Sequence, residues 1–141
     1  MRAGRARRLV VPDAILGEAV LVRRFASDAL KEFRTPLPRV AIVVGLGGRT
    51  GSALVAPLAE QLLRTDQVLI ACTIPFRFEG RNRRRRTDEA LVKVVGLGCR
   101  LTVVECEAHL KRVPRDMPFS DALAWIDQSV AAVTREWFVG T

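Results

Sequence analysis

The sequence predicts an α/β protein with three layers built around a short, mainly parallel β-sheet. Two apolar runs, residues 40–44 and 68–74, are typical of buried strands, and residues 100–105 form a third predicted strand. The segments between them show the apolar spacing of helices, and strands that alternate with helices in this way predict parallel pairing. The chain of 141 residues is long enough for one domain with a single core.

The chain begins with a basic segment that precedes a predicted helix. We expect residues 1–11, which are rich in arginine, to form a flexible tail that is either a solvated terminus or an electrostatic tether. Residues 12–141 then form the domain. Apolar residues recur at helical spacing within 12–33, so we expect a helix that is broken near Gly17 or begins again at Ser27.

A glycine-rich stretch from Gly45 to Ser52, GLGGRTGS, follows the first strand, and residues 53–63 then show helical spacing. A strand, a glycine-rich turn and a helix together present backbone N–H groups and the positive end of a helix to a phosphate. The stretch is neither a Walker P-loop nor a G-x-G-x-x-G motif. Glycine content alone therefore leaves a phosphate site and an ordinary tight turn equally open.

Two more helices are expected after the second strand. The first, over 81–95, begins with the arginine run 81–86 and ends at Gly96 and Gly98. The sequence VVGLGCR at its end repeats VVGLGGR of the glycine-rich stretch, which we interpret as coincidence because here the glycines follow a helix. The second helix covers 119–137. The residues expected to face the core are Ala90, Leu91, Val94 and Val95 in the former and Leu123, Ile126, Val130 and Val133 in the latter.

Bulk composition narrows the functional classes. The chain is 49% hydrophobic and 27% charged, which is typical of a soluble globular protein. Its formal net charge of +8 comes mostly from arginine and predicts non-specific attraction to polyanions. Three scattered cysteines imply no disulfide framework, so we expect a reducing, cytoplasmic location. No apolar stretch is long enough for a transmembrane helix.

Two motifs resemble those of the tubulin/FtsZ GTPase family. GLGGRTGS is similar to the signature loop G-M-G-G-G-T-G-[ST]-G of the bacterial members. The segment Pro75–Gly80 together with Arg83 is similar to the family's P-F-x-F-E-G-x-x-R. A weaker similarity continues from Leu101 to Trp137, and the resemblance is strongest over 39–138. It implies a partial FtsZ/tubulin-type, Rossmann-like nucleotide-binding domain.

The resemblance also implies a site for GTP or GDP, with or without Mg²⁺. The glycine-rich stretch would hold phosphate, and Glu79 and Arg83 would hold the ribose, the alternative for this pair being a surface salt bridge. Asp127 falls on an Asn of the family's central helix and would accept hydrogen bonds from guanine. No catalytic residue or metal ligand is assigned. The nucleotide-binding residues implied are Gly45, Gly47, Gly48, Arg49, Thr50, Gly51, Ser52, Glu79, Arg83 and Asp127.

Departures from the family pattern weaken the expected activity. Arg49 replaces a glycine and either contacts phosphate or fills the site. Cys106 replaces an Asn that contacts the base, and Leu123 lies near a stacking phenylalanine of the family. The family's first phosphate loop and its catalytic N-x-D-x-x-D loop have no counterpart here, so we expect weak or lost GTP binding and little or no hydrolysis.

The leading hypothesis is therefore a degenerate FtsZ-like GTP-binding protein. Its expected role is in cell division or filament assembly, through contact with FtsZ or with a second copy of itself. One alternative is a basic module that binds nucleic acid or anionic surfaces through the arginine run 81–86. Few aromatic residues accompany that run, so such binding would be mainly electrostatic. The other alternative is a fragment without independent function.

Overall fold

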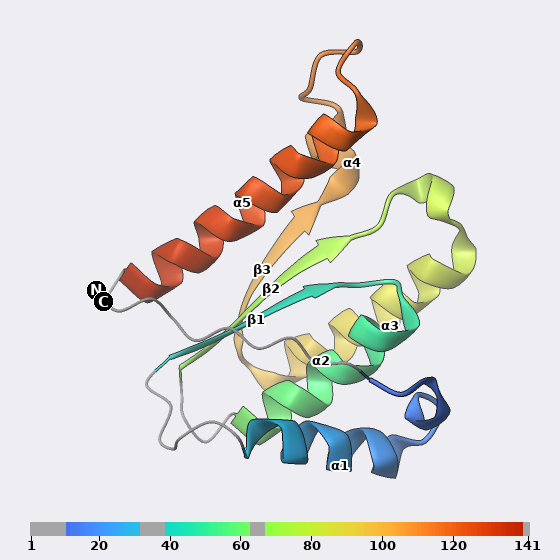
Figure 1. The fold of residues 1–141 in the computed structure, drawn as a ribbon, viewed down its shortest axis with the longest axis vertical. Coiled ribbons are helices and arrows are strands. Elements are labelled where there is room, and N and C mark those ends of the chain that lie inside the picture. The colour runs from blue at the N-terminus through green and yellow to red at the C-terminus, as the bar shows by residue number, and fades with distance from the viewer. Residues whose placement is uncertain (1–10, 32–38, 63–66, 140–141) are drawn as a thin grey trace.

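The computed structural model describes residues 11–31, 39–62 and 67–139 of the chain. Their central element is a sheet of three parallel strands in the order β1-β2-β3. The strands are β1 (Val40–Gly45), β2 (Val68–Ile74) and β3 (Arg100–Glu105). Because they are parallel, all three end at one edge of the sheet, which we call the carboxyl edge (Figure 1). The predicted parallel α/β sheet is confirmed.

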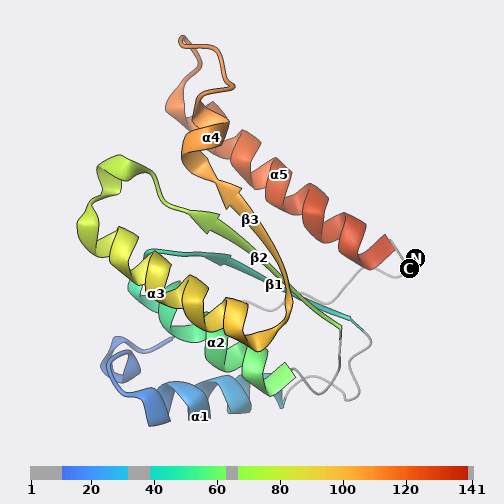
Figure 2. The same cartoon turned by 180° about the vertical axis from the view of Figure 1, so that it is seen from behind.

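Helices cover both faces of this sheet. In Figures 1 and 2, α1, α2 and α3 lie on one face and α5 lies on the other, which gives the three predicted layers. Short helical turns precede α1 and α3, and α4 directly follows β3. The helices in chain order are η1 (Asp13–Ile15), α1 (Ala19–Leu30), α2 (Arg49–Leu62), η3 (Arg77–Glu79), α3 (Arg81–Leu97), α4 (Cys106–Leu110) and α5 (Phe119–Val139).

The main core lies between the sheet and the α2–α3 layer. Val55 of α2 and Val94 of α3 are almost fully buried against Ile70 and Cys72 of β2. Since β2 is the central strand and is covered on both faces, its continuous apolar run follows from its position. A smaller cluster on the other face packs α5 against β2 and β3 through Ile126 and its neighbours.

The first strand is less buried than the sequence predicts. It lies at an edge of the sheet, and the side chain of Val43 is 58% exposed on the α5 side. Figure 1 shows why: α5 starts near the end of β3 and crosses obliquely toward the amino end of β1. There the Trp137 indole N–H donates to the Val40 carbonyl at 3.1 Å, and the guanidinium of Arg39 lies 4.6 Å from the ring centroid. The expectation of a fully buried β1 is therefore wrong.

Helix boundaries correct several other expectations. The first long helix begins at Ala19, after the break near Gly17, and continues through Ser27 without restarting. Helix α2 begins at Arg49, so the second half of the glycine-rich stretch is helical. Helix α3 includes Gly96 and ends at the left-handed Gly98 (φ +74°). The tail 1–10 and the expected helix residues Phe33 and Leu63 lie outside the described residues.

Two side chains expected in the core are exposed. Helix α3 buries a narrow stripe through Thr87, Ala90 and Val94, which leaves Val95 at its side and 66% exposed. Helix α5 similarly buries residues four apart, and Leu123 is 39% exposed beside that stripe. Both helices meet the sheet from one side only, so their buried faces are narrower than the apolar pattern suggests. Within the described part of the chain, no helix has the length and apolar character needed to cross a bilayer.

Candidate nucleotide-binding site

The glycine-rich stretch turns the chain from β1 into α2 at the carboxyl edge. Gly45 ends β1, and the N–H of the buried Leu46 donates to the Thr73 carbonyl at 3.0 Å, which ties the turn to β2. Helix α2 begins three residues later at Arg49. The N–H groups of a first helical turn have no partner within the helix, so they are available to an anion or to water at this edge.

Gly47 is required by close packing as well as by its backbone conformation. Its φ is +100°, and a Cβ on it would lie 2.9 Å from Pro75 Cγ and 3.3 Å from the Arg83 carbonyl oxygen. Its N–H donates to the Ser52 hydroxyl at 2.9 Å, and its carbonyl accepts from Arg86 at 3.0 Å. The N–H and the carbonyl of Gly47 are therefore both used within the protein and are not free for a ligand.

Gly51 is a second packing glycine. A Cβ on it would lie 2.5 Å from the Gly45 carbonyl oxygen, because the first turn of α2 packs directly against the end of β1. Gly48, in contrast, has open space where a Cβ would stand. Arg49 and Thr50 are exposed next to it. Of the predicted phosphate-binding residues, Gly45, Arg49 and Thr50 are exposed, and Gly48 is partly exposed with open space where a Cβ would stand.

The second motif contacts the first. Glu79 closes the η3 turn by accepting the Phe76 N–H at 2.6 Å, and its other carboxylate oxygen lies 3.7 Å from an Arg83 nitrogen. This exposed ion pair is the surface salt bridge that the sequence analysis gave as the alternative to ribose binding. It stabilises the fold by at most about 1 kcal/mol. Pro75 and Arg83 of this motif supply two of the three atoms nearest a Cβ built on Gly47, and Thr87 of α3 supplies the third.

Asp127 and Gly45 line the same hollow on the α5 side of the carboxyl edge. It has a volume of about 640 Å³ and lies where α5 leaves β1 uncovered. A second hollow of about 400 Å³, next to the end of α4, contains none of the predicted site residues. The full lining of the larger one is Val43, Val44, Gly45, Thr73, Asp127, Val130, Ala131, Thr134 and Arg135.

Cys106, the first residue after β3, places its thiol at the carboxyl edge. Burial raises its pKa, and the nearby carboxylates of Glu79, Asp127 and Glu107 raise it further. Glu79 of η3 and Asp127 of α5 therefore both lie close enough to the Cys106 thiol to raise its pKa. Because the thiol stays protonated near neutral pH, it offers only a weak hydrogen-bond donor where the family has an amide.

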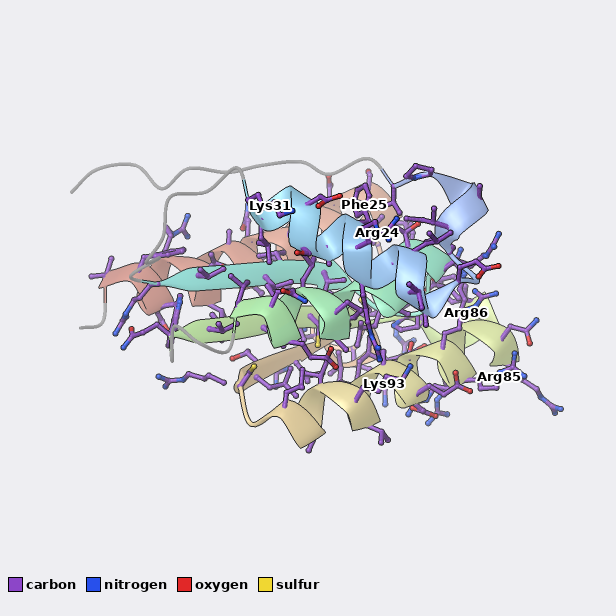
Figure 3. All side chains as sticks on the ribbon, turned by 90° about the horizontal axis from the view of Figure 1, so that it is seen from below. Arg24, Phe25, Lys31, Arg85, Arg86 and Lys93 are labelled. Carbon is purple, nitrogen blue, oxygen red and sulfur yellow. The ribbon has the colours of Figure 1, made fainter. Side chains whose placement is uncertain are left out.

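The arginine run is largely paired within the protein. Arg84 and Arg85 lie 3.5 and 3.9 Å from Asp88 and Glu89, one helical turn on. Figure 3 shows α1, α2 and α3 side by side, with Arg85 and Arg86 near one end of α3 and Lys93 further along it. The run therefore forms the exposed first turns of a helix that are partly neutralised by its own acidic residues.

Three phenylalanines at the same edge were not predicted as functional. The ring of Phe78 stacks on buried Phe76 with centroids 5.0 Å apart and an interplanar angle of 11°. Phe119, the first residue of α5, lies 5.6 Å from Phe76 and 6.3 Å from Phe78. The only sequence signal was the pair of phenylalanines in the second motif, since Phe119 is distant in the chain. Thr73 was also missed, although the register pairs it with Gly45.

No family model matches the chain, and no curated protein matches it. The similarity to the tubulin/FtsZ family thus depends on the two motifs and on their spacing. No group of three or more potential metal-ligating side chains occurs in the described ranges.

Proposed function

We propose that this protein binds a guanine nucleotide at the carboxyl edge of its sheet, in the manner of the tubulin/FtsZ family. The observation that carries the proposal is the contact between the two motifs. Gly47 of the first packs against Pro75 and Arg83 of the second, although the motifs are well separated in the sequence. Each motif follows one of two adjacent parallel strands, so the fold brings both to the carboxyl edge, where open parallel sheets bind their ligands.

The phosphates are proposed to bind at the start of α2. Gly48 has no neighbouring side chain, and exposed Arg49 and Thr50 can add a guanidinium and a hydroxyl to the first-turn N–H groups. The exposure of Arg49 favours a phosphate contact over a side chain that fills the site. Glu79 and Arg83 are proposed to bind the ribose once their ion pair opens.

The base is proposed to lie toward α5. Asp127 would accept the N1–H and 2-amino groups of guanine, an arrangement that adenine does not offer. We assign no catalytic residue and expect binding without measurable turnover, because positioned water and full charge stabilisation are both needed for phosphoryl transfer. A role in cell division, through FtsZ or a second copy of this chain, is part of the same proposal, with the exposed edge of β1 as a candidate contact.

The test is a titration of the purified protein with a fluorescent GTP analogue. Gly48→Asp places a carboxylate at the phosphate position without a clash and should weaken binding by about tenfold or more. Gly96→Asp, at an equally open glycine on α3, is the matched control and should bind like the parent. Excess GTP should compete better than ATP.

Arg83→Ala provides a second variant in the other motif and should also weaken binding. Absence of saturable binding at millimolar analogue would overturn the proposal. So would equal binding by the Gly48→Asp and Gly96→Asp proteins, because the ligand would then bind away from the start of α2.

A further inference from the structure

We propose that the exposed rings of Phe78 and Phe119 form a stacking site for single-stranded nucleic acid, with the surrounding arginines contacting its phosphates. The rings are not part of the proposed nucleotide site, but they border it. Phe78 lies in η3 next to Glu79, which is assigned above to the ribose, and Phe119 begins α5, whereas the proposed phosphate site lies at the start of α2.

The two rings are held in place by a third. Phe76 is only 5% exposed, whereas Phe78 is 70% exposed and Phe119 is 50% exposed. Phe78 is nearly parallel to Phe76, so one of its faces is covered and the other is open. Phe119 is tilted by 59° to Phe78, which presents two differently oriented aromatic surfaces at one place. Such a platform loses little conformational entropy when a base stacks on it.

Cationic side chains lie on both sides of the platform in the sequence. Arg77 precedes Phe78 and Arg81 begins α3, while Arg112 and Arg115 lie in the loop that leads to Phe119; all four are exposed. Within the described ranges, none of these four forms an ion pair with a carboxylate. They differ in this from Arg84 and Arg85, whose charges are matched by acidic residues on the same helix.

This combination favours a single strand over other polyanions. Aromatic rings stack on unpaired bases of any sequence, and nearby arginines neutralise the backbone. A duplex offers no free base face to Phe78 or Phe119, and a lipid surface offers none at all. The sequence alone suggested mainly electrostatic binding, because Phe78 and Phe119 come together only in the fold.

Fluorescence anisotropy with labelled ten-nucleotide oligouridine and oligothymidine tests the proposal. Phe78→Ala and Phe119→Ala should each weaken binding about tenfold, the effect typical of losing one base–aromatic stack. Phe138→Ala is the matched control, because Phe138 is an exposed phenylalanine at the opposite end of α5. A duplex of the same length should bind at least about tenfold more weakly than the single strand.

The salt dependence of oligonucleotide binding distinguishes the contribution of the arginines from that of the phenylalanine rings. Arg77→Ala and Arg81→Ala should each reduce the slope of log affinity against log salt by about 0.7, whereas Phe78→Ala should leave the slope unchanged. Gly48→Asp should leave oligonucleotide binding intact, so failure of the GTP proposal and failure of this one are distinguishable. Equal affinity for duplex and single strand, or a Phe78→Ala/Phe119→Ala protein that binds like the Phe138→Ala control, would overturn the proposal.

Discussion

Two segments of this chain have almost the same sequence and opposite structures. Residues 43–49, VVGLGGR, and residues 94–100, VVGLGCR, differ at one position. The first ends strand β1 and begins helix α2, whereas the second ends helix α3 and begins strand β3. The residues before each segment decide the outcome: a β-branched run continues into the first, and a long helix with charged residues continues into the second.

The two segments share one backbone requirement and differ in their surroundings. The corresponding glycines Gly47 and Gly98 both have positive φ, +100° and +74°. Gly47 is enclosed by Pro75, Thr87 and the Arg83 backbone, but nothing lies within 4 Å of a Cβ built on Gly98. The first segment is thus a packed junction between two motifs, and the second is an open helix cap.

Alanine at the paired glycines should give the largest difference between the segments. Gly98→Ala incurs the left-handed backbone cost alone, about 1–2 kcal/mol. Gly47→Ala adds overpacking against Pro75 and Thr87, for a total loss of about 2–5 kcal/mol in the free energy of unfolding. Urea denaturation followed by circular dichroism measures both.

Equal losses for the two alanine variants would contradict this comparison. They would mean that the space around Gly47 is as open as that around Gly98. Thr87→Ser is a useful control, because it keeps the hydroxyl that would lie 3.2 Å from a Cβ on Gly47 and that donates to the Arg83 carbonyl, so it should not relieve the loss caused by Gly47→Ala.

A second pair of glycines should give effects of opposite sign. Gly51→Ala places a Cβ 2.5 Å from the Gly45 carbonyl and should destabilise by about 1–3 kcal/mol. Gly96→Ala lies in open space inside α3 and should stabilise by about 0.5–1 kcal/mol, since glycine is a poor helix former. Thermal unfolding of the two variants is the measurement. A destabilising Gly96→Ala would indicate that α3 is not helical at that residue.

These pairs show what the sequence could and could not predict. The bounds of β2 were predictable, because this central strand is a nearly continuous apolar run, and those of β3 also match the predicted strand 100–105. The exposure of Val43 could not be predicted, because it depends on the oblique path of α5. The hydrogen bond from Trp137 to Val40 fixes that path at the amino end of β1. Apolar periodicity reports that a face is buried but not how wide it is, hence the errors at Val95 and Leu123.

The residues of the candidate site could be predicted from the sequence. Which of them are required for packing and which are open to a ligand could not. Every glycine of the first motif looked equally suited to phosphate, yet Gly47 and Gly51 are required by packing and Gly48 is open. That distinction depends on Pro75 and Arg83, which are distant in the sequence. For the same reason the contact between Phe119 and the phenylalanines of the second motif could not be inferred before the fold was known.

The smallest expected effect concerns Cys99, which takes the place of Gly48 in the second segment. Cys99 is only partly buried, and its pKa is raised less strongly than that of Cys72, which burial raises to about 11. The thiolate is the reactive form, so at pH 8.5 we expect Cys99 to react with iodoacetamide well before Cys72. Mass spectrometry of timed samples gives the order.

The burial of Cys72 predicts that the free energy of unfolding depends on pH. Because the folded pKa of Cys72 lies above its unfolded value of 9.0, the stability it contributes is fully present below pH 9 and is lost as the pH rises toward 11. Cys72→Ala should remove this part of the alkaline loss, and Cys99→Ala should change it less. If the two variants lose stability equally between pH 9 and 11, the thiol of Cys72 is no better shielded from water than that of Cys99, and the central strand is more accessible than its exposed fraction of 1% implies.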